Sequence, residues 1–470
     1  MSNKAVHMRK HRTKEETIKA SAHLEERSSP GPLAAICVGY FMVILDTMVV
    51  SVALPDLSRS LHAGTTELQW IVDAYSLVFA ALLLSTGALG DRRGSKSIYQ
   101  TGMAIFILSS LASGFAPTAA FLVIARCIQG AGAALAVPSS LSLLQAAYPD
   151  TATRRKAFGI WGAVAGIAAG AGPIVGGALV SGLGWRSVFF LNVPIGALGL
   201  ILAARWLPST PRRDHGLDPT GQIAMVICLA GLTIALIEMG SLGLDSPLVA
   251  GSLTAFVLGG VTFVIAEYRV GNPMLPMSLF ASTTFSSANV VGLLINLGFY
   301  GELFVMSLYL QQIRGFTPLL AGAALTPELA MAVIGSTISG RVMARLGPRI
   351  PMLFGLGLGG AGLTSLIVAS AHSPYQLLIP GLMATGLGMS LVMPAATAAV
   401  MEAAPPERSG LASGALNAAR QVGGVIGVAL LGSFIANRAT FLVGLRAGML
   451  VAGGVFLLAA AVTVVFVEQT

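Results

Sequence analysis

Long runs of apolar residues, separated by short polar segments, recur along most of the chain. A helix that crosses a bilayer needs about 20 mostly apolar residues, and fourteen runs approach or exceed that length. They lie near residues 33–55, 69–89, 98–117, 118–138, 157–180, 188–206, 220–240, 248–268, 284–310, 319–340, 350–371, 375–397, 409–434 and 446–467. The pattern predicts an all-α polytopic membrane protein with fourteen transmembrane helices.

Composition strengthens this prediction. Of the 470 residues, 55% are hydrophobic and 10% are charged, whereas about 25% of residues are charged in soluble proteins. No soluble core could bury so much apolar surface, so the composition excludes a water-soluble enzyme and a disordered chain.

The net charge of +8 might suggest a nucleic-acid partner, but the basic residues lie in short clusters between the apolar runs. If the sides alternate from a cytosolic tail of residues 1–32, 21 of the 28 Lys and Arg residues are cytosolic and five are external. The positive-inside rule therefore supports the span count. It predicts a cell-membrane protein with both termini in the cytosol. Residues 1–29 hold no apolar segment with a cleavage site, so we expect no signal peptide.

Motifs of catalysis and of direct ATP coupling are missing from the sequence. Cys37, Cys127 and Cys228 lie in apolar runs at unrelated spacings, which predicts neither a disulfide framework nor a metal site. The chain has no phosphate-binding GxxxxGK[ST] loop, no zinc-type His/Cys cluster and no nucleophile elbow. We therefore expect a protein that is not an enzyme, holds no cofactor and takes its energy from an ion gradient.

A faint internal duplication divides the chain. The segments GALGDRRGSK (87–96) and GRVMARLGPR (340–349) align at an offset of 253 residues. One follows the second span and the other follows the tenth. Two six-helix halves around a two-helix insert explain this spacing; the alternative is two unrelated basic loops. Transporters built from parallel halves bind substrate near the midplane between them. The predicted parts are the tail (1–32), the N-terminal half (33–206), the linker with two inserted helices (207–283) and the C-terminal half (284–470).

Several segments resemble motifs of one transporter family. They are LDTMVVSVALP (45–55), GALGDRRGSK (87–96), LVIARCIQGAGAA (122–134), GAGPIVGGAL (170–179), WRSVFFLNVPIG (185–196), YLQQIRGFTPLLAGAALTP (309–327) and LNAARQVGG (416–424). Their order over residues 33–467 resembles the major facilitator superfamily. Within it, the chain resembles the fourteen-span drug:proton antiporters, and most of all antibiotic exporters of the methylenomycin-resistance kind.

The resemblance implies a proton-driven efflux antiporter that exports hydrophobic drugs or antibiotics, cationic ones included, by alternating access. Its expected partners are a small-molecule substrate, protons and the lipid bilayer, and a monomer would suffice. One alternative is an exporter of a single endogenous metabolite, such as an amino acid or a biosynthetic product. A more distant alternative is a membrane sensor that transports nothing.

Ionisable residues inside the apolar runs are candidates for function, because a charge at a helix centre costs about 2.5–3.5 kcal/mol. Asp46, Arg126, Glu302 and Glu328 lie eight or nine residues from the predicted outer ends of four different spans. At about 1.5 Å per residue, all four lie roughly 12–14 Å deep, near the middle of a core about 30 Å thick. We therefore expect them to share one polar cavity.

Asp46 is the first candidate for proton coupling. An apolar setting favours the neutral form of a carboxyl group and a nearby arginine favours the charged form, so protonation can respond to conformation. The resemblance implies this role for Asp46 and for Arg126 of the fourth-span motif; the alternative is a static ion pair. Glu302 and Glu328, on the ninth and tenth spans, are candidates for a second proton site or for binding a cationic substrate.

Three further residues are candidates for the substrate cavity. Asp73 resembles an acid of cationic-drug exporters, although it lies only four residues into its span and would otherwise be solvated at the outer mouth. Asn289 and Asn296 lie seven residues apart and so share one face of the ninth span. They would contact either the substrate or another helix.

Tyr300, Asn417 and Arg420 complete the predicted cavity. Tyr300 would supply an aromatic wall on the ninth span, with plain packing as the alternative. Arg420 lies beside Asn417, nearer the cytosolic side of span 13. It would line the inner cavity and bind an anionic group, or it would bond to backbone carbonyls.

Glycines are the candidate packing and conformational positions. Those of the fifth span, together with its proline, are Gly170, Gly172, Pro173, Gly176 and Gly177. Such glycines let another backbone approach closely, and a proline permits a kink. The resemblance implies that this segment seals the cavity and limits leak. It also marks Gly130, in the fourth-span motif.

The loop after the second span carries Gly87, Asp91, Arg92 and Gly94. By itself it is a positive-inside loop, and the resemblance implies a latch that stabilises the outward-open state. In the second copy of this loop, Ala344 stands where the motif has an aspartate. Any latch must therefore be asymmetric.

Overall fold

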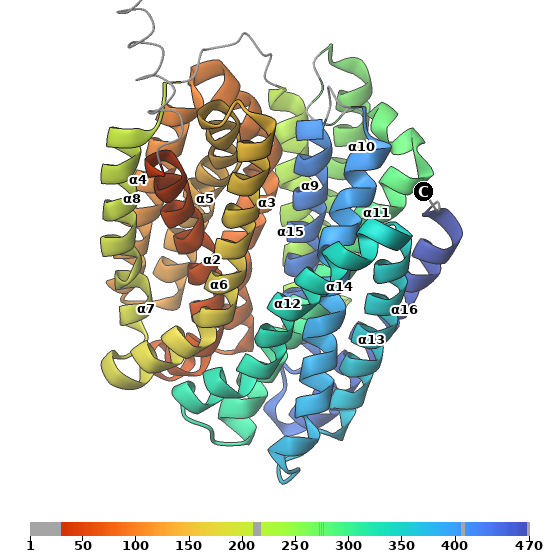
Figure 1. Ribbon diagram of the computed structural model, residues 1–470. Coiled ribbons are helices and arrows are strands. Elements are labelled where there is room, and N and C mark those ends of the chain that lie inside the picture. The colour runs from red at the N-terminus through yellow and green to blue at the C-terminus, as the bar shows by residue number, and fades with distance from the viewer. Residues whose placement is uncertain are drawn as a thin grey trace, which may run out of the picture.

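The computed structural model describes residues 30–209, 218–271, 273, 275, 277–405 and 409–467 as a bundle of helices, with no strand in this part of the chain (Figure 1). The long helices are α2 (Gly31–Leu61), α3 (Thr65–Arg93), α4 (Ser95–Gly114), α5 (Ala119–Ala147), α6 (Thr151–Leu183), α8 (Asn192–Trp206), α9 (Pro219–Leu242), α10 (Pro247–Arg269), α11 (Thr283–Leu308), α12 (Pro318–Leu346), α13 (Arg349–Ser365), α14 (Ile379–Ala403), α15 (Ser409–Phe434) and α16 (Phe441–Phe466). Short helical turns are α7 (Arg186–Phe190), η1 (Met277–Ala281), η2 (Tyr309–Ile313), η3 (Leu366–Val368), η4 (Tyr375–Leu377) and η6 (Arg438–Thr440).

The all-α membrane fold is confirmed. Among the described residues, 13 helical segments are long and apolar enough to cross a membrane, and each coincides with an expected span. The remaining expected span, 98–117, is α4, a 20-residue helix whose Ser and Gly residues dilute its apolar character. It packs against α5 and α8, inside the same bundle.

Polar residues between the apolar runs fix where helices begin. The side chains of Thr118, Asp150 and Thr317 each accept a hydrogen bond from the backbone N–H three residues later. Such N-caps satisfy one of the free backbone donors at a helix start. The helices therefore begin at the polar segments that separate the predicted spans.

The helices pack in the same pairs in the two copies of the repeat. Counted within each copy, the first helix contacts the fourth, fifth and sixth, the fourth also contacts the second and third, and the third contacts the sixth. Figure 1 shows the N-terminal copy (red to yellow) beside the C-terminal copy (teal to blue). The exact domain boundaries stay a prediction.

Residues matched by the repeat also have matching roles. Gly94 and Gly347 follow the last residues of α3 and α12 with φ angles of 94° and 70°, a left-handed conformation that glycine adopts without steric cost. The Lys96 Nζ donates to the carbonyls of Ala204 and Leu207, at 3.2 and 2.7 Å. Arg349, its match, donates to the Val464 carbonyl near the end of α16 at 2.5 Å. In each copy, a cation therefore satisfies carbonyls at the end of the sixth helix.

Two seams join the copies, one between α6 and α12 and the other between α3 and α15. The inserted helices α9 and α10 pack on each other, and α9 also contacts both α3 and α15. Ala80, Ala81 and Leu229 form a small apolar cluster there, with Val422 packed against it. The insert therefore lies along the α3–α15 seam.

Some predictions fall outside the described residues. They concern residues 1–29 of the expected tail and the side chains of Gly87, Asp91 and Ala344, although α3 and α12 run through these three positions. Arg92, beside Asp91, is exposed.

Candidate functional site

Asp46 lies on α2 at the centre of a fully buried polar network. Its Oδ2 accepts a hydrogen bond from Arg126 Nη1 of α5, at 2.5 Å. Its Oδ1 accepts from Gln129 Nε2 at 3.0 Å and from Asn192 Nδ2 at 2.6 Å. Two helices, α5 and α8, therefore supply three donors to one carboxylate, which gives a buried negative charge the partners it needs.

Arg126 connects this network to neighbouring helices. Its Nε donates to the Ile71 carbonyl of α3 at 3.2 Å, and its Nη1 also donates to Gln129 Oε1 at 2.9 Å. The guanidinium carbon lies 4.3 Å from the centroid of the Tyr75 ring, a cation–π distance. Gln129 and Asn192 belong to segments that carry the family resemblance, yet sequence reasoning did not select them. Their signal was a polar side chain within an apolar run.

Glu302 of α11 and Glu328 of α12 form a second buried acidic group. Both side chains are completely buried, and the two carboxyl groups act on each other electrostatically. None of their four oxygens has a hydrogen-bond partner among the described residues. Unlike Asp46, these acids face no cation and no amide donor.

The single polar cavity expected for the four ionisable residues is not what the structure shows. Asp46 contacts Arg126, and Glu302 is next to Glu328, but the two pairs lie in different copies of the repeat. Their common depth stays a prediction, and depth alone does not give the direction in which each side chain points around its helix.

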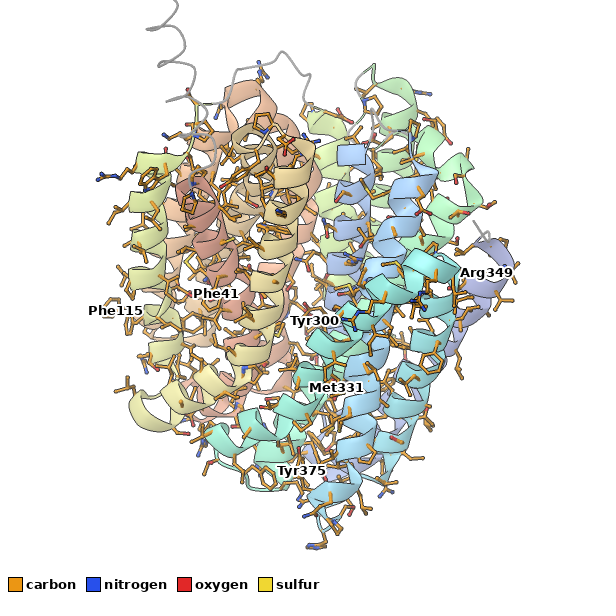
Figure 2. The ribbon with its side chains drawn as sticks, viewed as in Figure 1. Phe41, Phe115, Tyr300, Met331, Arg349 and Tyr375 are labelled. Carbon is orange, nitrogen blue, oxygen red and sulfur yellow. The ribbon has the colours of Figure 1, made fainter. Side chains whose placement is uncertain are left out.

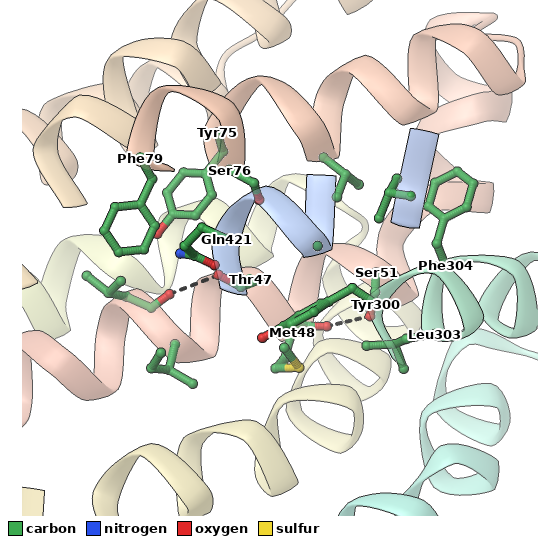
Figure 3. Close-up of a pocket in the computed structure, with 15 residues that line it drawn as sticks. Thr47, Met48, Ser51, Tyr75, Ser76, Phe79, Tyr300, Leu303, Phe304 and Gln421 are labelled. Carbon is green, nitrogen blue, oxygen red and sulfur yellow. Dashed lines mark hydrogen bonds between the residues drawn. The ribbon is translucent and has the colours of Figure 1, made fainter. Parts of the chain in front are cut away.

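A small cavity lies between the two copies and is mostly lined by apolar and aromatic groups (Figure 3). Its volume is about 70 Å³. Figure 2 shows Tyr300 between the two groups of helices. Of the predicted cavity residues, only Tyr300 lines this space. Lining residues that sequence reasoning missed include Thr47, Ser51, Tyr75, Ser76, Phe79 and Gln421.

Tyr75 connects the cavity to the Asp46 network, because one face of its ring meets Arg126 while the residue also lines the cavity. The cavity therefore lies one aromatic side chain away from a buried ion pair.

Side chains join the two copies at the end of the bundle opposite the start of α2, which we call the outer end after its predicted orientation. Ser307 Oγ donates to the Ser51 carbonyl at 2.5 Å, and Gln311 Nε2 donates to the Val52 carbonyl at 3.1 Å. On the other seam, the Gln69 Nε2 of α3 donates to carbonyls of α15 at 3.2 and 2.8 Å. These bonds close the outer end of the cavity.

The glycines of α6 allow close contact at this same end. A Cβ on Gly177 would lie 2.6 Å from the Pro318 carbonyl oxygen of α12, and one on Gly176 would lie 3.0 Å from the Val49 Cα of α2. A Cβ on Gly172 would overlap Met48 of α2. Gly322 of α12 packs directly against the Pro173 carbonyl. Gly170, nearer the other end, faces open space.

Gly130 has the same function on α5, where its missing side chain makes room for the Tyr75 carbonyl of α3.

Asp73 is fully buried, and neither carboxylate oxygen has a hydrogen-bond partner among the described groups. The alternative that it is solvated at the outer mouth is therefore wrong. The helix begins at Thr65, four residues before the expected span, so Asp73 lies deeper than its place in the apolar run indicated.

The predicted cavity amides lie elsewhere. Asn289 and Asn296 donate to the carbonyls four residues earlier in their own helix, each at 2.8 Å, and neither lines the central cavity. Arg420 donates to the Met393 carbonyl and to Thr397 Oγ1, both at 2.8 Å, which is the backbone-bonded alternative. Asn417, one turn away, is partly buried.

Comparisons with known proteins agree with this architecture. The model of the Major Facilitator Superfamily matches residues 36–304 and 288–470. The Methylenomycin A resistance protein of Streptomyces coelicolor is 38% identical over 400 residues, covering 85% of this chain and 84% of that protein. The protein of the same name from Bacillus subtilis is 37% identical over 447 residues, covering 94% and 96%. The multidrug resistance protein Stp of Mycobacterium tuberculosis is 38% identical over 405 residues, covering 86% and 75%.

Solved structures support the fold alone. The crystal structure of a POT family transporter in complex with a thioalcohol-conjugated peptide superposes with a TM-score of 0.72 at 14% identity, covering 93% of this chain and 96% of that one. With its repeated six-helix pairing, its seams and these relatives, the chain belongs to the Major Facilitator Superfamily.

Proposed function

We propose that this protein is a proton-driven exporter of hydrophobic drugs or antibiotics, working as an antiporter in the cell membrane with both termini in the cytosol. The observation that carries the proposal is the position of Tyr75, which lines the central cavity and packs on the Asp46–Arg126 pair. The names of its relatives, which are resistance and efflux proteins, support export.

The Asp46 network can couple protonation to cavity shape. When Asp46 gains a proton, its attraction for Arg126 falls, and the guanidinium keeps as partners Gln129, the Ile71 carbonyl and the rings of Tyr75 and Phe189. A shift of Arg126 would move Tyr75, a wall of the cavity. Protonation of Asp46 would therefore favour one position of Tyr75 in the cavity wall, and bound substrate would favour another.

The size of the cavity indicates where the structure stands in the transport cycle. Drug-sized ligands occupy pockets of about 300–1,000 Å³, and this cavity has about 70 Å³. Because the outer end is closed by side-chain bonds between the copies, substrate binding requires the copies to separate toward the cytosolic side. Alternating access would then carry the substrate outward.

Proteoliposomes with an imposed proton gradient test this function, with transport of the lipophilic cationic dye ethidium as the readout. We expect dye movement that collapses with the gradient and is abolished by Asp46→Asn. Asp56→Asn is a matched control, since Asp56 lies on the same helix and pairs with Arg59 at its exposed end. Gradient-independent movement, or full activity of Asp46→Asn, would contradict the mechanism.

If folded protein moves no dye, a panel of amino acids and biosynthetic products tests the alternative of a dedicated metabolite exporter. Transport of a single member of the panel would replace drug export with that function.

A further inference from the structure

Among the described residues, Glu302 and Glu328 are two buried acids that neither line the central cavity nor pair with a cation. The pair lies among α11, α12 and α14, beside a buried apolar cluster of Phe299, Leu329 and Met389. None of the cavity-lining residues of α11 is Glu302. The pair therefore occupies a compartment separate from the cavity.

The surroundings of the pair determine its protonation state. A buried carboxylate without cation or donor is so costly that the group takes up a proton instead. The titratable groups facing Glu302 and Glu328 are the two acids themselves and Tyr375 of η4; α14 contributes Gly386 and Met389, which do not titrate. No described Lys, Arg or His forms an ion pair with either acid.

Tyr375 connects the pair to the outer end. Figure 2 shows Tyr375 near the outer end of the bundle. Its hydroxyl donates to the Ala324 carbonyl of α12 at 2.7 Å, one helical turn from Glu328. Glu328 acts electrostatically on Tyr375, which is partly exposed. One aromatic side chain therefore lies between the pair and the outer solution.

The same helix also forms the outer closure. Gly322, less than two turns from Glu328 on α12, packs against the Pro173 carbonyl of α6. On the other side of α12, Gly386 of α14 packs directly on the Glu328 backbone carbonyl. A charge on Glu328 would need hydration or a hydrogen-bond donor, and we expect α12 to move away from these close neighbours to provide it.

We propose that Glu302 and Glu328 form a proton-loading site that carries two protons while the outer end is closed, and that loss of these protons drives α12 away from α6. Protons enter from the outer side past Tyr375. Once loaded, the neutral pair permits closure. This inference rests on the proposed antiport and adds to the Asp46 network a second proton site that does not line the drug cavity.

Carbodiimide labelling tests the site without any substrate, so its failure is distinct from a failure of drug export. Dicyclohexylcarbodiimide reacts with protonated carboxyl groups in apolar sites. We expect mass spectrometry of the wild-type protein in liposomes to find the adduct on Glu302 or Glu328, with less labelling as pH rises, and none on Asp46. Glu302→Gln and Glu328→Gln should each remove the adduct at the substituted position, whereas Asp46→Asn should leave labelling unchanged.

Infrared difference spectra between acidic and alkaline pH cover the case in which the reagent does not reach the closed site. The band of protonated carboxyl groups should lose intensity in each single glutamine variant and lose the most in the double variant. Spectra identical to wild type in the double variant would overturn the proposal. So would labelling at Asp46 in place of the pair.

Spin labels test the link to closure. Gly182→Cys on α6 and Leu320→Cys on α12 place labels at exposed positions at the outer end of the α6–α12 seam. We expect the label distance to grow as pH rises, and to stay short at every pH when Glu302→Gln and Glu328→Gln are added. Tyr375→Phe, which keeps the ring, should retain both end states but reach the closed one more slowly after a drop in pH. A pH response that survives the double glutamine variant would disprove the coupling.

Discussion

Removing the cation of the buried ion pair should destabilise the protein strongly, and removing both charges should restore most of the loss. Arg126→Met keeps a long side chain in the same space but leaves Asp46 with two of its three donors. Breaking a buried pair on one side costs about 3–5 kcal/mol, because an uncompensated charge remains buried. We therefore expect Arg126→Met to lower the free energy of unfolding by that amount.

The double variant Asp46→Asn, Arg126→Met isolates the pair. The amide oxygen of the new side chain can keep the hydrogen bonds that Gln129 and Asn192 donate to Asp46 Oδ1, and no net charge stays buried. We expect the double variant to lose less than Arg126→Met alone, with a coupling energy above about 1.5 kcal/mol, since contacting residues couple by about 0.5–3 kcal/mol.

Unfolding in mixed micelles, titrated with SDS and followed by tryptophan fluorescence, measures these differences. The exposed pair Asp56–Arg59 of the same helix is the matched control. A double-mutant cycle on this pair should give a coupling energy of less than about 1 kcal/mol. Additive losses at positions 46 and 126, within about 0.5 kcal/mol, would refute the reasoning, because a buried pair cannot be energetically independent.

Three further predictions concern packing and capping. Gly322→Val would drive a side chain into the Pro173 carbonyl; we expect a cysteine introduced at Ser51, which is buried and lines the cavity, to become accessible to a membrane-impermeant maleimide. Asn192→Ala removes the donor to Asp46 and to Ser110, and should lower stability by about 1.5–3 kcal/mol, as for a hydrogen bond to a charged group, measured by the same SDS titration. Lys96→Ala and Arg349→Ala each free helix-end carbonyls and should cost similar amounts, about 0.5–1.5 kcal/mol each; a large difference would argue against equivalent roles in the repeat.

The fold could be predicted from the sequence because a bilayer requires long apolar helices, and loop charge fixes their alternation. The repeat could be recognised in the sequence because its glycine and basic residues have local roles. Gly94 and Gly347 need a left-handed backbone, and Lys96 and Arg349 reach the nearest helix end. Such features depend on neighbours in the chain or on one adjacent helix.

The site was harder to predict because it depends on rotation of each helix about its axis. The sequence predicted the same membrane depth for Glu302 and Asp46. Only the packing of the helices shows that the two side chains belong to separate groups, Asp46 with Arg126 and Glu302 with Glu328. Asn289 and Asn296 do share a spacing of seven, yet each amide bonds to its own helix. Gln129 and Asn192 can be recognised as donors to Asp46 only once α2, α5 and α8 are placed together.

The insert changes how the bilayer itself can reach the cavity. Because α9 packs on both α3 and α15, it covers the seam between these two helices. Among the described helices, neither inserted helix forms a packing interface with α6 or α12. The two seams therefore differ in what covers them, and we expect a hydrophobic substrate dissolved in the bilayer to enter laterally at the α6–α12 seam and not at the α3–α15 seam.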